Sequence, residues 1–141
     1  MKTLRYYLPV VFVAFSLFAT PGCQKGGGGG GGATPEEVKL DVETTPLANG
    51  HVEAPAPGPT FPLKVTIKSA MPSKGVKIDV TAKPDGGTVA FFNSSITSNA
   101  ATNNFIITGA PASVVSVVDI TVTSVSASSN TWRGSYKFSK K

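Results

Sequence analysis

The sequence is poor in the residues that form covalent cross-links and metal centres. It contains one cysteine and one histidine among 141 residues. A single Cys excludes an intramolecular disulfide, and one Cys with one His cannot complete the ligand set of a structural zinc site. Charged residues are also scarce, at 15% of the chain, which argues against a highly charged disordered protein. We therefore expect a folded domain with an apolar core, without a metal ion or another cofactor.

Helical periodicity is also missing beyond the N-terminal segment. Apolar residues instead alternate with polar ones, which is the pattern of a strand with one buried face. Val76, Ile78 and Val80, for example, alternate with Lys77 and Asp79. Turn-forming Pro, Gly, Asn and Ser residues separate the alternating segments. The predicted strands cover residues 38–43, 63–68, 76–83, 88–93, 105–108, 116–126 and 131–139, with loops over 45–62 and 94–104.

Seven short strands within residues 35–141 are typical of a β-sandwich. In strand number, in length and in the closing strand–turn–strand pair over 117–139, this domain resembles the immunoglobulin-like sandwiches of extracytoplasmic bacterial lipoproteins. The resemblance implies an all-β, immunoglobulin-like sandwich of about seven antiparallel strands. The domain lacks a Cys…Trp…Cys pattern, so it is not of the antibody type.

The N-terminal segment has the organisation of a secretory signal. Lys2 and Arg5 supply positive charge, residues 8–18 are apolar, and small or turn-forming residues precede Cys23. The apolar stretch is shorter than the roughly 20 residues that a membrane-spanning helix needs. We therefore predict a signal helix within residues 1–22.

This segment resembles the signal of a bacterial lipoprotein, in which a lipobox ends in cysteine, and Gly22 before Cys23 fits that pattern. The resemblance implies that residues 1–22 are removed and that Cys23 becomes the N-terminal residue. It would then carry acyl chains such as palmitate. One acyl chain binds a membrane only reversibly, whereas two or three chains form a stable anchor. The membrane is therefore the first expected partner.

Residues 23–34 are predicted to be a tether, because seven consecutive glycines occupy 26–32. Polyglycine loses the most backbone entropy on ordering and is expected to stay flexible. The resemblance to small envelope lipoproteins of Bacteroidota implies attachment to the outer membrane. In that group acidic residues after the Cys often signal export to the surface, but Gln24 and Lys25 follow it here. The periplasmic face and the cell surface therefore both stay open.

The sequence offers no group of residues that is typical of catalysis. His51 lies in the Pro-rich segment 45–62 with only Glu53 nearby, and we interpret it as a solvated loop residue. Asp41 and Glu43 face the same side of one predicted strand, where solvation is the more ordinary role of two carboxylates. We predict that the protein is not an enzyme and has neither a catalytic site nor a metal site.

Two further features concern binding partners. Residues 64–141 hold nine basic and three acidic residues, but an export signal argues against nucleic acid as the partner. Trp132, Tyr136 and Phe92 are candidate ligand-binding residues, because flat aromatic rings stack on sugars. Phe91 and Phe92 are consecutive, so they face opposite sides of a strand and one of them can be exposed.

The sequence thus predicts a non-enzymatic, lipid-anchored protein of the cell envelope whose domain is a structural or protein-interaction module. The alternative is a glycan-binding surface lipoprotein that uses exposed aromatic residues. The expected partners are the membrane, through the N-terminal lipid, and an envelope protein or a glycan.

Overall fold

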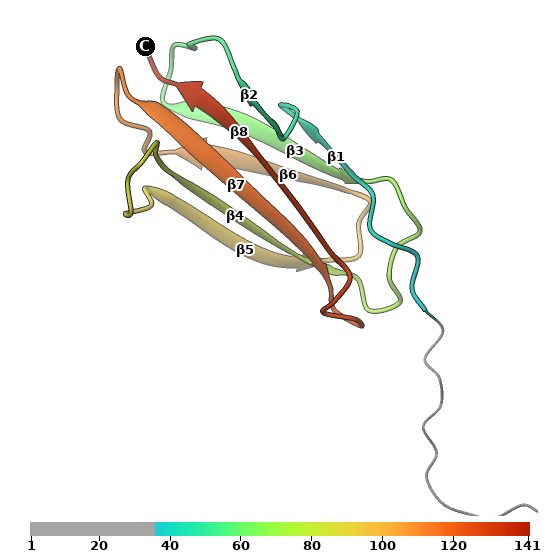
Figure 1. Ribbon diagram of the computed structural model, residues 1–141. Coiled ribbons are helices and arrows are strands. Elements are labelled where there is room, and N and C mark those ends of the chain that lie inside the picture. Colours follow the sequence, from blue (N-terminus) through green and yellow to red (C-terminus); the bar gives the residue numbers. More distant parts are fainter. Residues whose placement is uncertain (1–35) are drawn as a thin grey trace, which may run out of the picture. The chain divides into compact units, whose positions relative to one another are not determined.

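The computed structural model describes residues 36–141, and their regular elements are all β-strands (Figure 1). The predicted signal helix, Cys23 and the glycine tether lie outside the described residues. Within the described part of the chain, no helix is long and apolar enough to cross a membrane.

Eight strands form two sheets that face each other (Figure 1). The smaller sheet has the order β1 (Val42–Thr45), β3 (Thr60–Ile67), β6 (Thr102–Thr108). The larger sheet has the order β2 (Asn49–Val52), β8 (Thr131–Ser139), β7 (Val115–Ser124), β4 (Val76–Pro84), β5 (Phe92–Ser98). Only β4–β5 and β7–β8 are consecutive strands that pair within one sheet, so the chain passes repeatedly from one layer to the other.

The core lies between the sheets and is built from alternate residues of the long strands. On β4, Val76, Ile78 and Val80 are completely buried, whereas Lys77 between them is exposed. The same alternation buries one face of β3, β6 and β7. Each buried Val, Leu, Ile or Phe side chain contributes about 1.5–3 kcal/mol. The all-β prediction is confirmed, and the four strands with the clearest alternation, β3, β4, β7 and β8, lie close to where the sequence predicts them.

The expectation of about seven antiparallel strands is wrong in one respect, because β2 lies inside the predicted loop 45–62. It is an eighth strand and runs parallel to β8, with Asn49 opposite Ser135 and Val52 opposite Lys137. None of the four residues of β2 is fully buried, so the segment has no apolar period from which it could be predicted. Its backbone pairing, and not its side chains, makes it a strand.

The predicted loop 94–104 is also wrong, because β5 extends through it to Ser98 and β6 begins at Thr102. The predicted strand 88–93 shifts accordingly, since β5 begins only at Phe92. β5 lies at the border of its sheet and pairs with β4 alone. It consists largely of Ser, Thr and Asn, so its composition resembles that of a turn. Its backbone nevertheless pairs with β4 along its whole length.

The first predicted strand, 38–43, is shorter than expected. Leu40 is buried, but it precedes β1 and is held by the turn between β7 and β8. The side chain of Asn130 accepts a hydrogen bond from the Leu40 N–H (2.9 Å) and donates one to the Val38 carbonyl (3.0 Å). An amide side chain thus substitutes for a neighbouring strand along this segment.

Gly134 allows the connection between β1 and β2 to approach β8. A Cβ atom at this position would lie 2.7 Å from the carbonyl oxygen of Ala48 and 2.5 Å from the Trp132 ring. The first contact is with backbone, which cannot move away by rotating a side chain. Gly134 is therefore required for the close approach of the connection to the inner face of β8.

We expect Gly134→Ala to lower the free energy of unfolding by about 1–3 kcal/mol, because the added methyl group overpacks the contact with Ala48. Ser135→Ala, at the next position and on the opposite face of β8, is the matched control and should change it by less than about 0.5 kcal/mol. Urea denaturation of both variants measures the difference. Equal stabilities would show that the connection is not held against β8 as described.

Candidate functional site

A partly open cavity of about 510 Å³ lies at the side of the domain where β1 has ended. β1 pairs with β3 only from Lys64 to Ile67, so the first half of β3 has no neighbouring strand on that side. The cavity begins beside Thr45 and Pro46, where the chain leaves the smaller sheet. It therefore results directly from the short length of β1.

The wall of the cavity is mainly apolar and comes from both sheets. Phe61 and Leu63 alternate on β3, Phe105 on β6 lies opposite Leu63, and Tyr136 and Phe138 alternate on β8. The rings of Phe61 and Phe138 pack with their centres 4.4 Å apart. The inward face of three strands thus continues into the cavity as an aromatic and aliphatic surface.

Small residues after β2 keep the cavity open. Beyond β2 the chain continues along β8, with the Glu53 N–H bonded to the Lys137 carbonyl (2.8 Å) and the Ala56 N–H bonded to the Ser139 carbonyl (3.1 Å). Ala54 and Ala56 line the cavity from this segment. A larger side chain at either position would occupy space that the two methyl groups leave free.

Tyr136 contributes a polar atom to this apolar surrounding. Its side chain is only 2% exposed, and its hydroxyl has no hydrogen-bond partner among residues 36–141. Burial raises the pKa of the Tyr136 phenol, and the nearby Glu53 carboxylate raises it further. The phenol is therefore held in its neutral form, which can donate a hydrogen bond.

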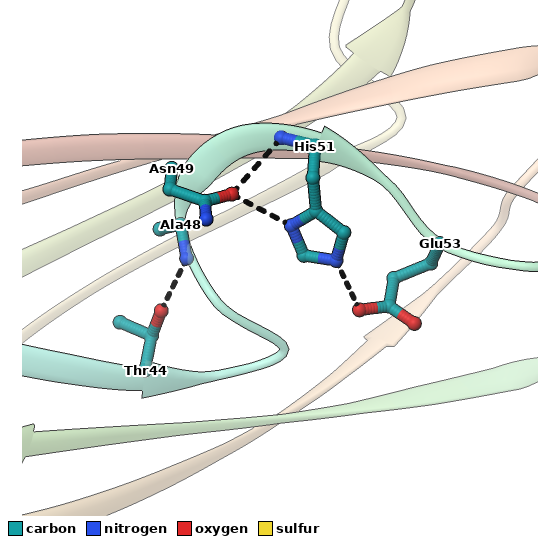
Figure 2. Close-up of polar contacts among 5 residues, drawn as sticks. All are labelled: Thr44, Ala48, Asn49, His51 and Glu53. Atoms are coloured by element: carbon teal, nitrogen blue, oxygen red, sulfur yellow. Dashed lines mark hydrogen bonds and ion pairs between the residues drawn. The ribbon is translucent and has the colours of Figure 1, made fainter.

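Figure 2 shows the polar contacts that hold the β2 side of the cavity. The backbone N–H of His51 donates to Asn49 Oδ1 (3.1 Å), and its ring Nδ1 lies 2.9 Å from the same oxygen. The other ring nitrogen, Nε2, lies 2.5 Å from Glu53 Oε1. Thr44 Oγ1 accepts a hydrogen bond from the Ala48 N–H (2.7 Å). His51 is thus a residue of strand β2 and not of a loop, although its side chain is partly exposed to solvent.

Both ring nitrogens of His51 face oxygen acceptors, so neither is directed at a hydroxyl or thiol nucleophile. The contact with Glu53 positions a carboxylate at the rim of the cavity. Within residues 36–141, no group of three or more His, Cys, Asp or Glu side chains could hold a metal ion. What the arrangement offers is apolar contact, one neutral phenol and one carboxylate, which together suit binding.

The three aromatic residues nominated from the sequence do not share one surface. Tyr136 is buried and lines the cavity. Phe92 lies on β5, which β4 and β7 separate from β8, and it packs against the core together with Phe91. Trp132 is half-buried over Gly134 and lines a second hollow beside Lys68. The three rings therefore do not form one surface on which a sugar could stack, and Cys23 lies outside the described residues.

Sequence reasoning missed Ala54, Ala56 and the aromatic wall as parts of one site. Two alanines next to prolines carry no functional signal, and Phe61, Phe105 and Phe138 follow the ordinary pattern of core residues. The one usable hint was the length of the Pro-rich connection, since a long connection has to cover some part of the sandwich.

Tyr136→Phe provides a test of the buried hydroxyl. At pH 7 we expect no loss of stability, because the variant removes a buried polar atom that has no partner. Above the ordinary tyrosine pKa of 10.0, the unfolded chain releases the phenolic proton while the folded chain retains it. Wild-type stability then falls with rising pH, by up to about 1.4 kcal/mol per pH unit, and the variant lacks this component.

Denaturation curves of both proteins at pH 7 and at pH values above 10 measure the difference. The lysines contribute equally to both proteins and cancel in the comparison. A variant that is clearly less stable at pH 7, or one with the same pH dependence as the wild type, would show that the hydroxyl is not buried without a partner.

No family model, curated protein or solved structure matches this chain. The function of the domain therefore has to be inferred from its own residues and their arrangement.

Proposed function

We propose that this chain is a lipid-anchored protein of a bacterial cell envelope, attached to the outer membrane, whose domain binds a partner and catalyses no reaction. Three features of the sequence support the proposed localisation: the signal-like N-terminal segment, Cys23 directly after Gly22, and the run of glycines that follows. Lipid on Cys23 would fix the N-terminus to the membrane, and the glycines would separate the domain from it.

We further propose that the domain is an immunoglobulin-like sandwich. In that fold one sheet contains strands A, B and E, and the facing sheet contains G, F, C and C′. The order β1-β3-β6 corresponds to A-B-E, and the order β8-β7-β4-β5 corresponds to G-F-C-C′. β2 then corresponds to a second part of strand A that has changed sheets and runs parallel to G. This correspondence of strand order supports the assignment.

The observation that carries the binding role is the apolar cavity beside β2. A buried surface of Phe61, Leu63, Phe105 and Phe138 that is reachable from one side suits an apolar group of a partner. We propose that an apolar side chain of another envelope protein occupies it. The aromatic residues named for glycan binding give that alternative little support, because Tyr136 is buried and Phe92 lies at the opposite border of its sheet.

The anchor is tested with Cys23→Ser. We expect the wild-type chain in the membrane fraction with an acyl-modified Cys23 as its first residue, as measured by mass spectrometry of the mature N-terminus. The variant should lose the modification and leave the membrane fraction, since no acyl chain then holds it. A wild-type chain with unmodified Cys23, together with a variant that stays in the membrane fraction, would contradict the lipid anchor.

The cavity is tested in cells with a photo-reactive phenylalanine analogue in place of Lys64, an exposed residue at the cavity that already has a long side chain. We expect a discrete adduct with an envelope protein, identified by mass spectrometry. Adding Ala56→Leu should reduce this adduct at least about fivefold, because the larger side chain fills the cavity. The same analogue at Ala90, which is exposed and outside the cavity, is the matched control. Equal adducts at both positions, or none at Lys64, would contradict the role of the cavity.

A further inference from the structure

The four strands at the borders of the two sheets differ in length and in charge. β1 and β2 have four residues each, and ionised groups lie on or directly after them: Glu43 pairs with Lys68 (3.5 Å) and Glu53 follows β2. β5 and β6 have seven residues each and contain no charged residue. The whole segment 86–118, which contains both strands, lacks Asp, Glu, Lys, Arg and His. Border strands are usually short, charged or interrupted by proline, because their free backbone groups invite pairing.

The backbone of β6 is directed so that half of its polar groups face away from the sheet. The Ile67 N–H donates to the Ala101 carbonyl (2.7 Å), so the odd-numbered residues of β6 are bonded to β3. Since the direction alternates along an antiparallel strand, the even-numbered residues direct their N–H and C=O groups outward. They are Thr102, Asn104, Ile106 and Thr108. Within residues 36–141, no other strand pairs with this side of β6 (Figure 1).

The first half of β3 also has a side without a neighbouring strand, the side beyond the end of β1, but this edge differs from that of β6. The Lys68 N–H donates to the Asp41 carbonyl (2.8 Å), so the even-numbered residues of β3 face the β1 side. Pro62 is one of them and lies beyond the end of β1. Because proline has no N–H, it removes the central donor from this open edge. The edge of β6 has no such protection.

We propose that β6 pairs antiparallel with β6 of a second copy of this chain, which joins two three-stranded sheets into one of six strands. In a two-fold pairing the strand meets itself, so each charged residue would lie near its own copy, and like charges that face each other are destabilising. β6 carries no charge and avoids this cost. The nearest lysine, Lys64 on β3, would be about three strand spacings, or about 14 Å, from its counterpart, which is beyond the screening length at physiological salt.

β6 suits this pairing better than β5 does. Ile106 on the outward face of β6 is 54% exposed, and a neighbouring strand would cover part of it. The outward residues of β5 are Asn93, Ser95 and Thr97, and the Ser95 hydroxyl already donates to Asp79 (2.6 Å). A strand added to β6 would therefore gain apolar contact as well as backbone hydrogen bonds. Asn104 and Ile106 also line the cavity, so the pairing edge of β6 and the cavity share these two residues.

The pairing is tested by oxidative cross-linking of the full-length chain in membranes. Asn104→Cys and Ile106→Cys each place a thiol near the centre of β6, where directly opposite Cβ atoms of paired strands lie about 4.5–5.5 Å apart. At least one of these variants should form at least fivefold more disulfide-linked dimer than two controls. The parent chain, whose only thiol is Cys23, measures the background. Thr123→Cys, which faces outward on the interior strand β7, measures random collision.

A second pair of variants tests whether the edge itself causes the dimer. Adding Thr102→Lys and Thr108→Lys to the cross-linking variant places lysines along the edge, and the dimer should fall to the control level. Thr60→Lys with Thr66→Lys is the matched control, because these residues lie opposite Thr108 and Thr102 on β3, one strand further in. It should leave the dimer within twofold of the parent variant.

Three outcomes would overturn the proposal. The first is no dimer above the controls at either Asn104→Cys or Ile106→Cys. The second is a dimer that persists with Thr102→Lys and Thr108→Lys. The third is efficient cross-linking of Thr97→Cys on β5 without cross-linking on β6, which would assign the pairing to the other uncharged border strand.

Discussion

The early end of β1 is the constraint on which most of the domain depends. β1 pairs with β3 over only four residues before the chain leaves at Thr45 and crosses to the facing sheet. Within residues 36–141, the first half of β3 therefore has no neighbouring strand on the β1 side, and the core opens there into the cavity. Pro62 lies in this open stretch and removes the N–H that would otherwise face outward. Gly134 is the counterpart on β8, because only a residue without a side chain allows Ala48 to pass so close.

β2, which follows the crossing to the larger sheet, is stabilised by other interactions than the long strands of the sandwich. β3, β4 and β7 bury continuous rows of apolar side chains, whereas no residue of β2 is fully buried. β2 is held by its backbone pairing with β8 and by the polar contacts among Thr44, Asn49, His51 and Glu53 (Figure 2). Regions with few buried apolar contacts open at a lower free energy than the core. The β2 side is therefore the wall of the cavity that can adapt most easily to an occupant.

The same contrast explains which parts could be predicted from the sequence. Alternation such as that of Val76, Ile78 and Val80 predicts a strand because one face is buried. β2 and β5 were missed because backbone bonds to a neighbour define them, and a neighbour is not visible in local sequence. The cavity was missed for a related reason: it depends on where β1 ends and on the small size of Ala54 and Ala56. Tyr136 was named as a candidate from its aromatic character, but alternation with Phe138 already placed it on the face that the core covers.

Charged residues are distributed unevenly among the strands of the domain. Lys77 with Asp79 and Lys83 with Asp119 form ion pairs on the outward face of the larger sheet. Exposed pairs of this kind contribute little stability, so their main effect is to keep that face solvated. The side formed by β5 and β6 has no such groups. Pairing through β6 would use the one long, neutral edge of the smaller sheet, and Asn104 and Ile106 on that edge also line the cavity. A second copy paired along β6 would therefore change one wall of the cavity, so that self-association and the binding of a partner would influence each other.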